Sequence, residues 1–491
     1  MSVGIRTQSA LAGRPILAWN ALLFRVALLF SALALGVAAV ALPPLAFALI
    51  LAGAIVLVGT GIEPLFGLGV TLLVAPFGAL ERIALPRLVP VDTGHVLLGL
   101  TLAAWFARRN LSRRLKAGAE VEGRPDLRPV DVALLAFLGV GAFSLAGALS
   151  LQYGLEELLK WLELGAVMGL VRAEARVPRR RNAIIALVLL SGLVQAGIGI
   201  WQFAFRHTGP EEFLILGRFY RAYGSFEQPN PFAGFMGLLL PLALGLALAE
   251  GKRWGRAILF LLAAAALGVA LIMSWSRGAW LGSLAALATL VVFAPRHRPV
   301  GLVLLFAAIA LGGLAWGAGL LPESLVARLS GFSEYTQVYD VRGVDITEAN
   351  FAVLDRLAHW GAAVDMLRDH PWLGVGLGNY EPVYPAYARL NWPNALGHAH
   401  NIYLNFAAET GLIGLAAYLV FWALGIALTL RSLGRARGLE RGLVLGLLGA
   451  WVHLSVHNLV DNLYVNGVYL HIGALLGLLT AIAYGQDHHQ R

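Results

Sequence analysis

The stretch that decides the fold is residues 231–294, PFAGFMGLLLPLALGLALAEGKRWGRAILFLLAAAALGVALIMSWSRGAWLGSLAALATLVVFA. It contains three apolar runs, 231–250, 254–273 and 277–294, which are separated only by short breaks. A helix needs about 20 mostly apolar residues to cross the hydrocarbon core of a bilayer. Each run therefore predicts one membrane-spanning helix.

The same pattern recurs along the whole chain of 491 residues. The other candidate runs are 21–42, 44–60, 64–80, 94–107, 131–150, 155–172, 182–204, 299–320, 400–430, 439–458 and 464–484. Some of the early runs are short or contain proline, so we expect twelve to fourteen spanning helices. The predicted fold is an all-α polytopic membrane protein with spanning helices in 1–320, a large hydrophilic loop at 321–399 that contains helices, and further spanning helices in 400–491.

The composition excludes other classes of protein. Hydrophobic types make up 58% of the residues and charged types 13%, about half of the soluble average of roughly 25%. The chain has no cysteine, which excludes disulfides, thiolate metal sites and cysteine nucleophiles. The net charge of +9 does not indicate nucleic-acid binding, because most of it lies in short loops where it is typical of contact with anionic lipid.

The distribution of Lys and Arg predicts the orientation. With the N-terminus inside, the inner loops hold 24 basic residues and the outer loops 11. The positive-inside rule therefore favours both termini in the cytoplasm. The segments 205–230, 274–277 and 321–399 would then face out. Within the last, 346–369 reads as an amphipathic helix, with a capping box from Asp345 and Glu348.

Two outer arginines lie next to apolar runs. Arg221 precedes Glu227, Gln228, Pro229 and Asn230, and we expect Asn230 to cap the helix that begins at Pro231. Arg277 lies in the break Ser274–Gly278. An arginine beside a helix N-terminus indicates an anion site. The structural alternatives are contact with phospholipid heads for Arg221 and with backbone carbonyl groups for Arg277.

Further polar residues are expected on the same outer face. The glycines of Gly374-Val-Gly376-Leu-Gly378, before Asn379 and Tyr380, indicate a tight exposed turn, because their spacing is not that of a dinucleotide-binding loop. His398 and His400 precede the run at 400–430, but their spacing does not predict a metal pair. Asp461 is either a solvated turn carboxylate or a residue that orients a histidine or binds a sugar hydroxyl.

Two arginines and one histidine on one face indicate a chemistry. Arginine binds a diphosphate leaving group with planar, bidentate donors and without a metal. A neutral histidine takes the proton of an attacking hydroxyl. Glycosyl transfer from a lipid diphosphate combines these two steps. The chain contains no Asp-x-Asp pair, which disfavours a metal-dependent transferase.

These motifs resemble the bacterial O-antigen ligase family, which also includes O-antigen polymerases and some protein O-glycosyltransferases. His400-Asn401, nine residues and then Gly411-Leu-Ile-Gly414 is similar to the ligase signature. The remaining similarity lies in the two arginine sites and in the stretch from Arg356 to Tyr380, which contains Asp369-His370-Pro371.

The resemblance implies a GT-C-like bundle in the bacterial inner membrane, with the active site on the periplasmic face. It implies an undecaprenyl diphosphate-linked glycan as donor, lipid A–core or another glycan or protein as acceptor, inversion at the anomeric carbon, and neither cofactor nor metal. His400 would be the base, and Arg221 and Arg277 would bind the diphosphate. Candidates for further substrate contacts are His398, Asn401, Asn230, Gln228, Glu227, Tyr380 and Asp461.

Alternatives remain at this stage. Within the same chemistry, the acceptor is either lipid A–core, a lipid-linked repeat unit in a polymerase, or a protein hydroxyl. From another class, a transporter of polyprenyl-linked glycans is the rival. It is disfavoured because its polar residues would be expected near the bilayer midplane and in paired repeats.

Overall fold

The computed structural model describes residues 43–78, 92–115, 127–251, 253–330, 341–347 and 350–485. The predicted run at 21–42 and Glu348 lie outside this part of the chain. Every other predicted run coincides with a helix. Those before the large loop are α2 Pro44–Ile62, α3 Pro64–Val74, α5 Thr93–Leu115, α6 Pro129–Ser144, α7 Leu151–Glu174, α8 Pro178–Trp201, α9 Pro229–Ala249, α10 Trp254–Met273, α11 Arg277–Phe293 and α12 Arg298–Gly317. Those after it are α16 Ile402–Arg435, α17 Gly438–His457 and α18 Val468–Gly485.

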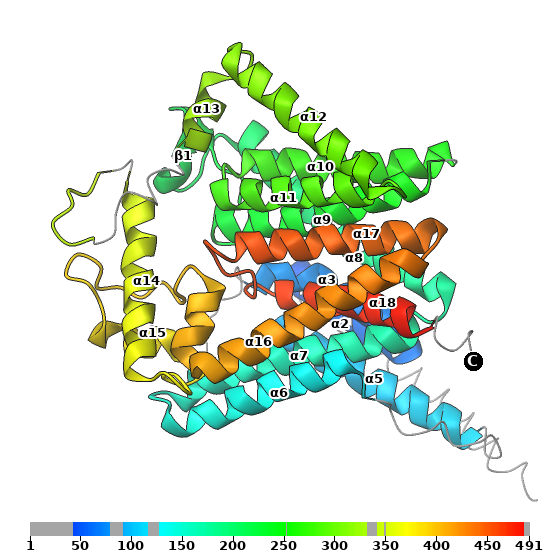
Figure 1. The fold of residues 1–491 in the computed structure, drawn as a ribbon. Helices are drawn as coiled ribbons and strands as arrows, with labels where there is room; N and C mark the ends of the chain where they lie inside the picture. Colours follow the sequence, from blue (N-terminus) through cyan, green and yellow to red (C-terminus); the bar gives the residue numbers. More distant parts are fainter. Residues whose placement is uncertain are drawn as a thin grey trace, which may run out of the picture.

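The helices form one bundle whose long axes run roughly side by side (Figure 1). Nine helices among the described residues are long and apolar enough to cross a membrane. α3, with the 3-10 turn that follows it, and α11 are shorter apolar helices. Strand structure in this part of the chain is limited to the two-residue pair β1 Leu214–Ile215 and β2 Phe219–Tyr220. The prediction of an all-α polytopic membrane protein is confirmed.

The core of the bundle lies along α9, α17 and α18, which are the helices most enclosed by their neighbours, whereas α2 and α12 expose nearly all of their apolar side chains. Small residues allow the close packing of α9 on α17. A Cβ atom added to Gly245 would lie 2.4 Å from the carbonyl oxygen of Gly442. In lipid there is no hydrophobic driving force between helices, so membrane helices associate through close van der Waals packing, which small residues allow.

The hydrophilic segment after α12 contains α13 Glu323–Ser330, α14 Phe351–Asp369 and α15 Tyr380–Val383. It lies at one end of the bundle (Figure 1). α14 begins at residue 351, later than predicted, with Asn350 as N-cap. Asn350 and Thr347 exchange hydrogen bonds between their side chains and backbones. These two hydrogen bonds lie where the chain changes from an extended segment to the helix.

The turn at 370–378 packs against α16, so the prediction of an exposed turn was wrong. Val375 N donates to Ala408 O and Gly376 N to Glu409 O, both at 2.9 Å, and Leu412 N donates to Pro371 O at 2.8 Å. α16 breaks at Gly411, whose φ of 64° and ψ of −169° are not helical. A Cβ atom on Gly411 would lie 2.2 Å from the carbonyl carbon of Trp372. Glycine is required here both for the left-handed φ and for the close backbone contact.

Candidate functional site

Arg221 lies at the end of the bundle that carries the hydrophilic segment, just before α9. Its Nε donates to Ser274 O at 2.8 Å, and its Nη2 donates to Asn230 Oδ1 at 3.0 Å. The helix begins at Pro229 with Gln228 as N-cap, so the prediction that Asn230 caps α9 was wrong. Asn230 instead holds the guanidinium group in place.

The break between α10 and α11 brings two more arginines to this point. Trp275 has a left-handed φ of 58°, which turns the chain so that Arg277 opens α11 behind the N-cap Ser276. Arg328 reaches the same turn from α13, and its Nη2 donates to Trp275 O at 2.8 Å.

A fourth arginine comes from the first turns of α14. Arg356 Nε donates to Val460 O at 3.0 Å, and its Nη1 donates to Ala352 O at 2.8 Å. These hydrogen bonds attach the hydrophilic segment to the loop between α17 and α18.

The four guanidinium groups influence one another. Burial, followed by the charges of Arg328, Arg356 and Arg277, lowers the pKa of Arg221 to about 9, and only Asp461 acts against them. A buried guanidinium group that has three other arginines near it indicates a site that suits an anion.

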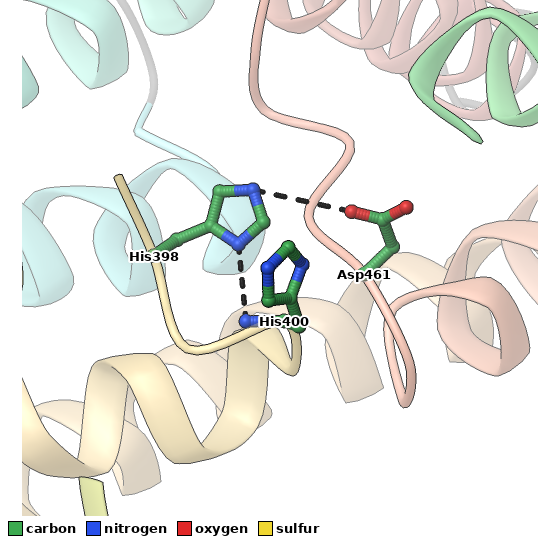
Figure 2. A group of neighbouring side chains, drawn as sticks. All are labelled: His398, His400 and Asp461. Carbon is green, nitrogen blue, oxygen red and sulfur yellow. Dashed lines mark hydrogen bonds and ion pairs between the residues drawn. The ribbon is translucent and has the colours of Figure 1, made fainter. Parts of the chain in front are cut away.

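Two histidines and a carboxylate, His398, His400 and Asp461, lie together (Figure 2), and the charge of Arg356 acts on both histidines. His398 Nδ1 accepts a hydrogen bond from His400 N at 3.0 Å, and its Nε2 lies 3.9 Å from Asp461 Oδ1. Because Nδ1 is an acceptor, the proton of neutral His398 is on Nε2, facing Asp461. His398 therefore fixes the backbone of His400 rather than offering a base of its own.

His400 has unmet hydrogen-bonding capacity. Neither of its ring nitrogens hydrogen-bonds to a residue that the structure describes, and both are buried; the same holds for His457, whose Nε2 lies 3.6 Å from Asp461 Oδ2. The nearest carboxylate oxygen is Asp355 Oδ2, 3.8 Å from Nε2. The backbone φ of 50° is unusual for a residue other than glycine. Burial, followed by the charges of His398 and Arg356, holds the pKa of His400 well below its usual value. The ring is thus a neutral imidazole at physiological pH.

Asp461 interacts both with the histidines and with Arg221. It is buried, with 5% of its side chain exposed, and its Oδ2 lies 3.6 Å from His457 Nε2. Burial alone would raise the pKa of Asp461, but His457, His398 and His400 together bring it below its ordinary value. Of the two readings that the sequence left open for Asp461, the structure therefore excludes the solvated turn carboxylate.

The ligand atoms of His398, His400 and Asp461 lie within 4.8 Å of one another. Such a set has the donor types of a cation site. The positive charge of Arg356 acts on both histidines, and Arg221 interacts with Asp461; these charges make the entry of a divalent cation electrostatically unfavourable. This electrostatic environment suits an anionic ligand.

The other predicted site residues have different places. Asn401 is the N-cap of α16 and accepts from Tyr403 N and Leu404 N. Tyr380 is buried, and its hydroxyl donates to His359 O at 3.1 Å. Glu227 and Gln228 are exposed beside the cluster.

Sequence reasoning missed Arg328, Arg356 and Asp355 as members of this site. Arg328 and Arg356 lie in the hydrophilic segment, where an arginine is not unusual, and only the fold brings them to Arg221. A signal for Arg356 was available, because this residue begins the stretch from Arg356 to Tyr380 that carries part of the family resemblance.

This fold and site define a class of protein, namely a polytopic helical membrane protein with a cationic pocket and a buried histidine at one end of its bundle. Residues 259–419 match the family model described as O-antigen ligase. A stretch of 210 residues is 30% identical to an O-antigen ligase of Pseudomonas aeruginosa, covering 43% of this chain and 44% of that protein. The chain thus matches less than half the length of this curated relative. These matches confirm the resemblance of this segment to the O-antigen ligase family. The matched segment includes Arg277, Arg328, Arg356 and His400, whereas Arg221 and Asp461 lie outside it.

Proposed function

We propose that this protein is a membrane glycosyltransferase that moves a glycan from undecaprenyl diphosphate to an acceptor hydroxyl, without a metal. The observation that carries the proposal is His400, a neutral imidazole whose ring nitrogens are buried and have no hydrogen-bond partner among the described residues. Arg356 acts on this ring and, together with Arg277 and Arg328, on Arg221. Buried polar atoms are normally satisfied, so an unpaired base beside an anion pocket indicates a place for substrate.

The charge of the pocket supports a diphosphate. Arg221, Arg277, Arg328 and Arg356 face two carboxylates, Asp355 and Asp461. Even with both carboxylates ionised, the positive charges exceed the negative ones by two. A polyprenyl diphosphate diester has one negative charge on each phosphate, and guanidinium groups bind phosphates with bidentate, charge-assisted hydrogen bonds.

In the proposed step, a ring nitrogen of His400 takes the proton of the acceptor hydroxyl as its oxygen forms a bond to the anomeric carbon. The bond from that carbon to the diphosphate oxygen breaks on the opposite face, which inverts the configuration. The arginines stabilise the negative charge that develops on the leaving diphosphate. The imidazolium then releases its proton to water.

The test is glycan transfer by purified protein with a lipid diphosphate-linked glycan and an acceptor. His400→Gln should lower kcat by about 10²- to 10⁴-fold, the usual contribution of a general base. His370→Gln is the matched control, since His370 is exposed at the end of α14. Full activity of His400→Gln would refute the mechanism.

The acceptor is part of the proposal and is tested separately. We propose lipid A–core, by analogy with the ligases, and an active site on the periplasmic face of the bacterial inner membrane. Supplying lipid A–core, lipid-linked repeat units or a protein acceptor in parallel reactions distinguishes a ligase from a polymerase and from a protein glycosyltransferase. Movement of the lipid-linked glycan across proteoliposomes without any product would favour a transporter.

A further inference from the structure

Two arginines are fixed on consecutive carbonyl groups of one turn. Arg221 Nε donates to Ser274 O, and Arg328 Nη2 donates to Trp275 O, each at 2.8 Å. Two residues later, Arg277 opens α11. The turn at Ser274 and Trp275 therefore gathers three guanidinium groups, one from before α9, one from α11 and one from α13.

The position of Arg328 is the unexpected one. It belongs to the hydrophilic segment, although the other two arginines border spanning helices. Among the charged neighbours of Arg221, it has the largest effect in lowering the pKa of Arg221. Such an effect requires the two cations to be close, which agrees with their binding to adjacent carbonyl groups.

We infer that Arg328 is a phosphate-binding residue that makes the site select a diphosphate over a monophosphate; this rests on the proposed function. A single phosphate carries all of its oxygens on one phosphorus atom, whereas two linked phosphates spread theirs over a longer span, which suits three guanidinium groups that come from different elements. The residue also links donor binding to the hydrophilic segment, because the diphosphate then contacts both α13 and the ends of the spanning helices.

The competing reading is that Arg328 only supports the turn by binding Trp275 O. Two substitutions separate these roles. Arg328→Gln keeps a donor for the carbonyl group but removes the charge, and Arg328→Lys keeps a charge but removes the planar fork. Arg368→Gln is the control, because Arg368 is an arginine of the same segment that is 74% exposed and pairs with Asp365.

The measurement is the binding of inorganic pyrophosphate and inorganic phosphate to the full-length protein in detergent, by calorimetry. In the wild-type protein and in Arg368→Gln, pyrophosphate should bind more tightly. Arg328→Gln should weaken pyrophosphate binding by about 10-fold or more, as for the loss of a charged hydrogen bond, and phosphate binding much less. Arg328→Lys should recover only part of the lost affinity, because it restores the charge but not the bidentate fork.

Unchanged pyrophosphate binding in Arg328→Gln, or an equal loss for both anions, would overturn the inference. Where Arg328→Gln does not fold, the lysine variant decides, because full wild-type pyrophosphate affinity and selectivity without the guanidinium fork would show that Arg328 does not bind phosphate as proposed. The proposed function fails separately. If the wild-type protein selects pyrophosphate but transfers no glycan, the role of Arg328 in binding stands and the proposed transferase function is refuted.

Discussion

At the scale of single residues, the site depends on the unequal roles of two neighbouring histidines. His398 has its Nδ1 occupied by the backbone N–H of His400, whereas His400 has both ring nitrogens without a partner among the described residues. Chain position alone does not distinguish them. The backbone at His400 is left-handed, and such local strain is typical of functional residues.

The pH dependence of transfer follows from the surroundings of His400. His398, Arg356 and His359 lower its pKa in addition to burial, and Asp461 raises it. A base with a lowered pKa stays unprotonated in mildly acidic solution, so the rate should persist below the ordinary pKa of histidine. Arg356→Gln removes one of the lowering charges, and the acidic limb of the profile should move to higher pH. The measurement is kcat against pH at saturating donor.

The matched control for the pH experiment is Arg368→Gln, whose exposed guanidinium group is bonded to Asp365. Its profile should coincide with that of the wild type. A shift of the Arg356→Gln profile to lower pH would contradict the assignment of His400 as the titrating base.

At the scale of elements, the glycines of α16 and of the turn at 370–378 are explained by one contact. The signature spacing places His400 just before α16 and the helix break at Gly411 within it, where the turn at 370–378 packs. This is a structural reason for a motif that the sequence shows only as a spacing.

Gly411→Ala tests this contact. Alanine at a left-handed φ costs roughly 1–2 kcal/mol, and its Cβ would lie 2.2 Å from the carbonyl carbon of Trp372. We expect a lower Tm and faster proteolysis within 341–399. Gly434→Ala on the same helix has nothing within 4 Å of its Cβ and should leave both unchanged or slightly improved. Equal behaviour of the two variants would show that the turn does not depend on Gly411.

The spanning helices could be predicted from the sequence because length and hydropathy are local properties, and the helices of the described part follow the predicted runs. The turn at 370–378 was predicted to be exposed because its burial depends on a contact with α16, about 35 residues away. The same limit applies to Arg328 and Arg356, whose relation to Arg221 is created by tertiary packing. The sequence around a glycine or an arginine does not show which distant residue it will contact in the fold.

At the scale of the whole molecule, charge divides the two ends of the bundle. The end opposite the site carries ion pairs that join helix ends, such as Arg172 with Asp131 and Arg181 with Glu440. At the site end, Arg221, Arg328 and Arg356 lie close enough to affect one another, and each donates to a carbonyl oxygen, as Arg441 does at the other end.

The orientation is testable because the chain has no cysteine of its own. Trp372→Cys places a thiol at the site end, where the side chain is 67% exposed. Arg253→Cys places one at the other end, where 70% of the side chain is exposed. In intact spheroplasts, an impermeant maleimide should label the first variant and not the second until the membrane is permeabilised. The reverse pattern would place the site in the cytosol.

The hydrogen bonds between the 370–378 turn and α16 also bear on how a long glycan escapes after transfer. These hydrogen bonds fix the 370–378 turn to α16, the helix that begins just after His400, so that the two segments form one unit. The turn at Ser274 and Trp275 binds Arg221 and Arg328 and forms a second unit. The loop Asn458–Asp461 lies between them and bonds to α16 through Ile402 N and to α14 through Arg356 Nε. We therefore expect this loop to bend when the product leaves. His400 should keep its position beside α16 and the 370–378 turn and so be able to take the proton of the next acceptor.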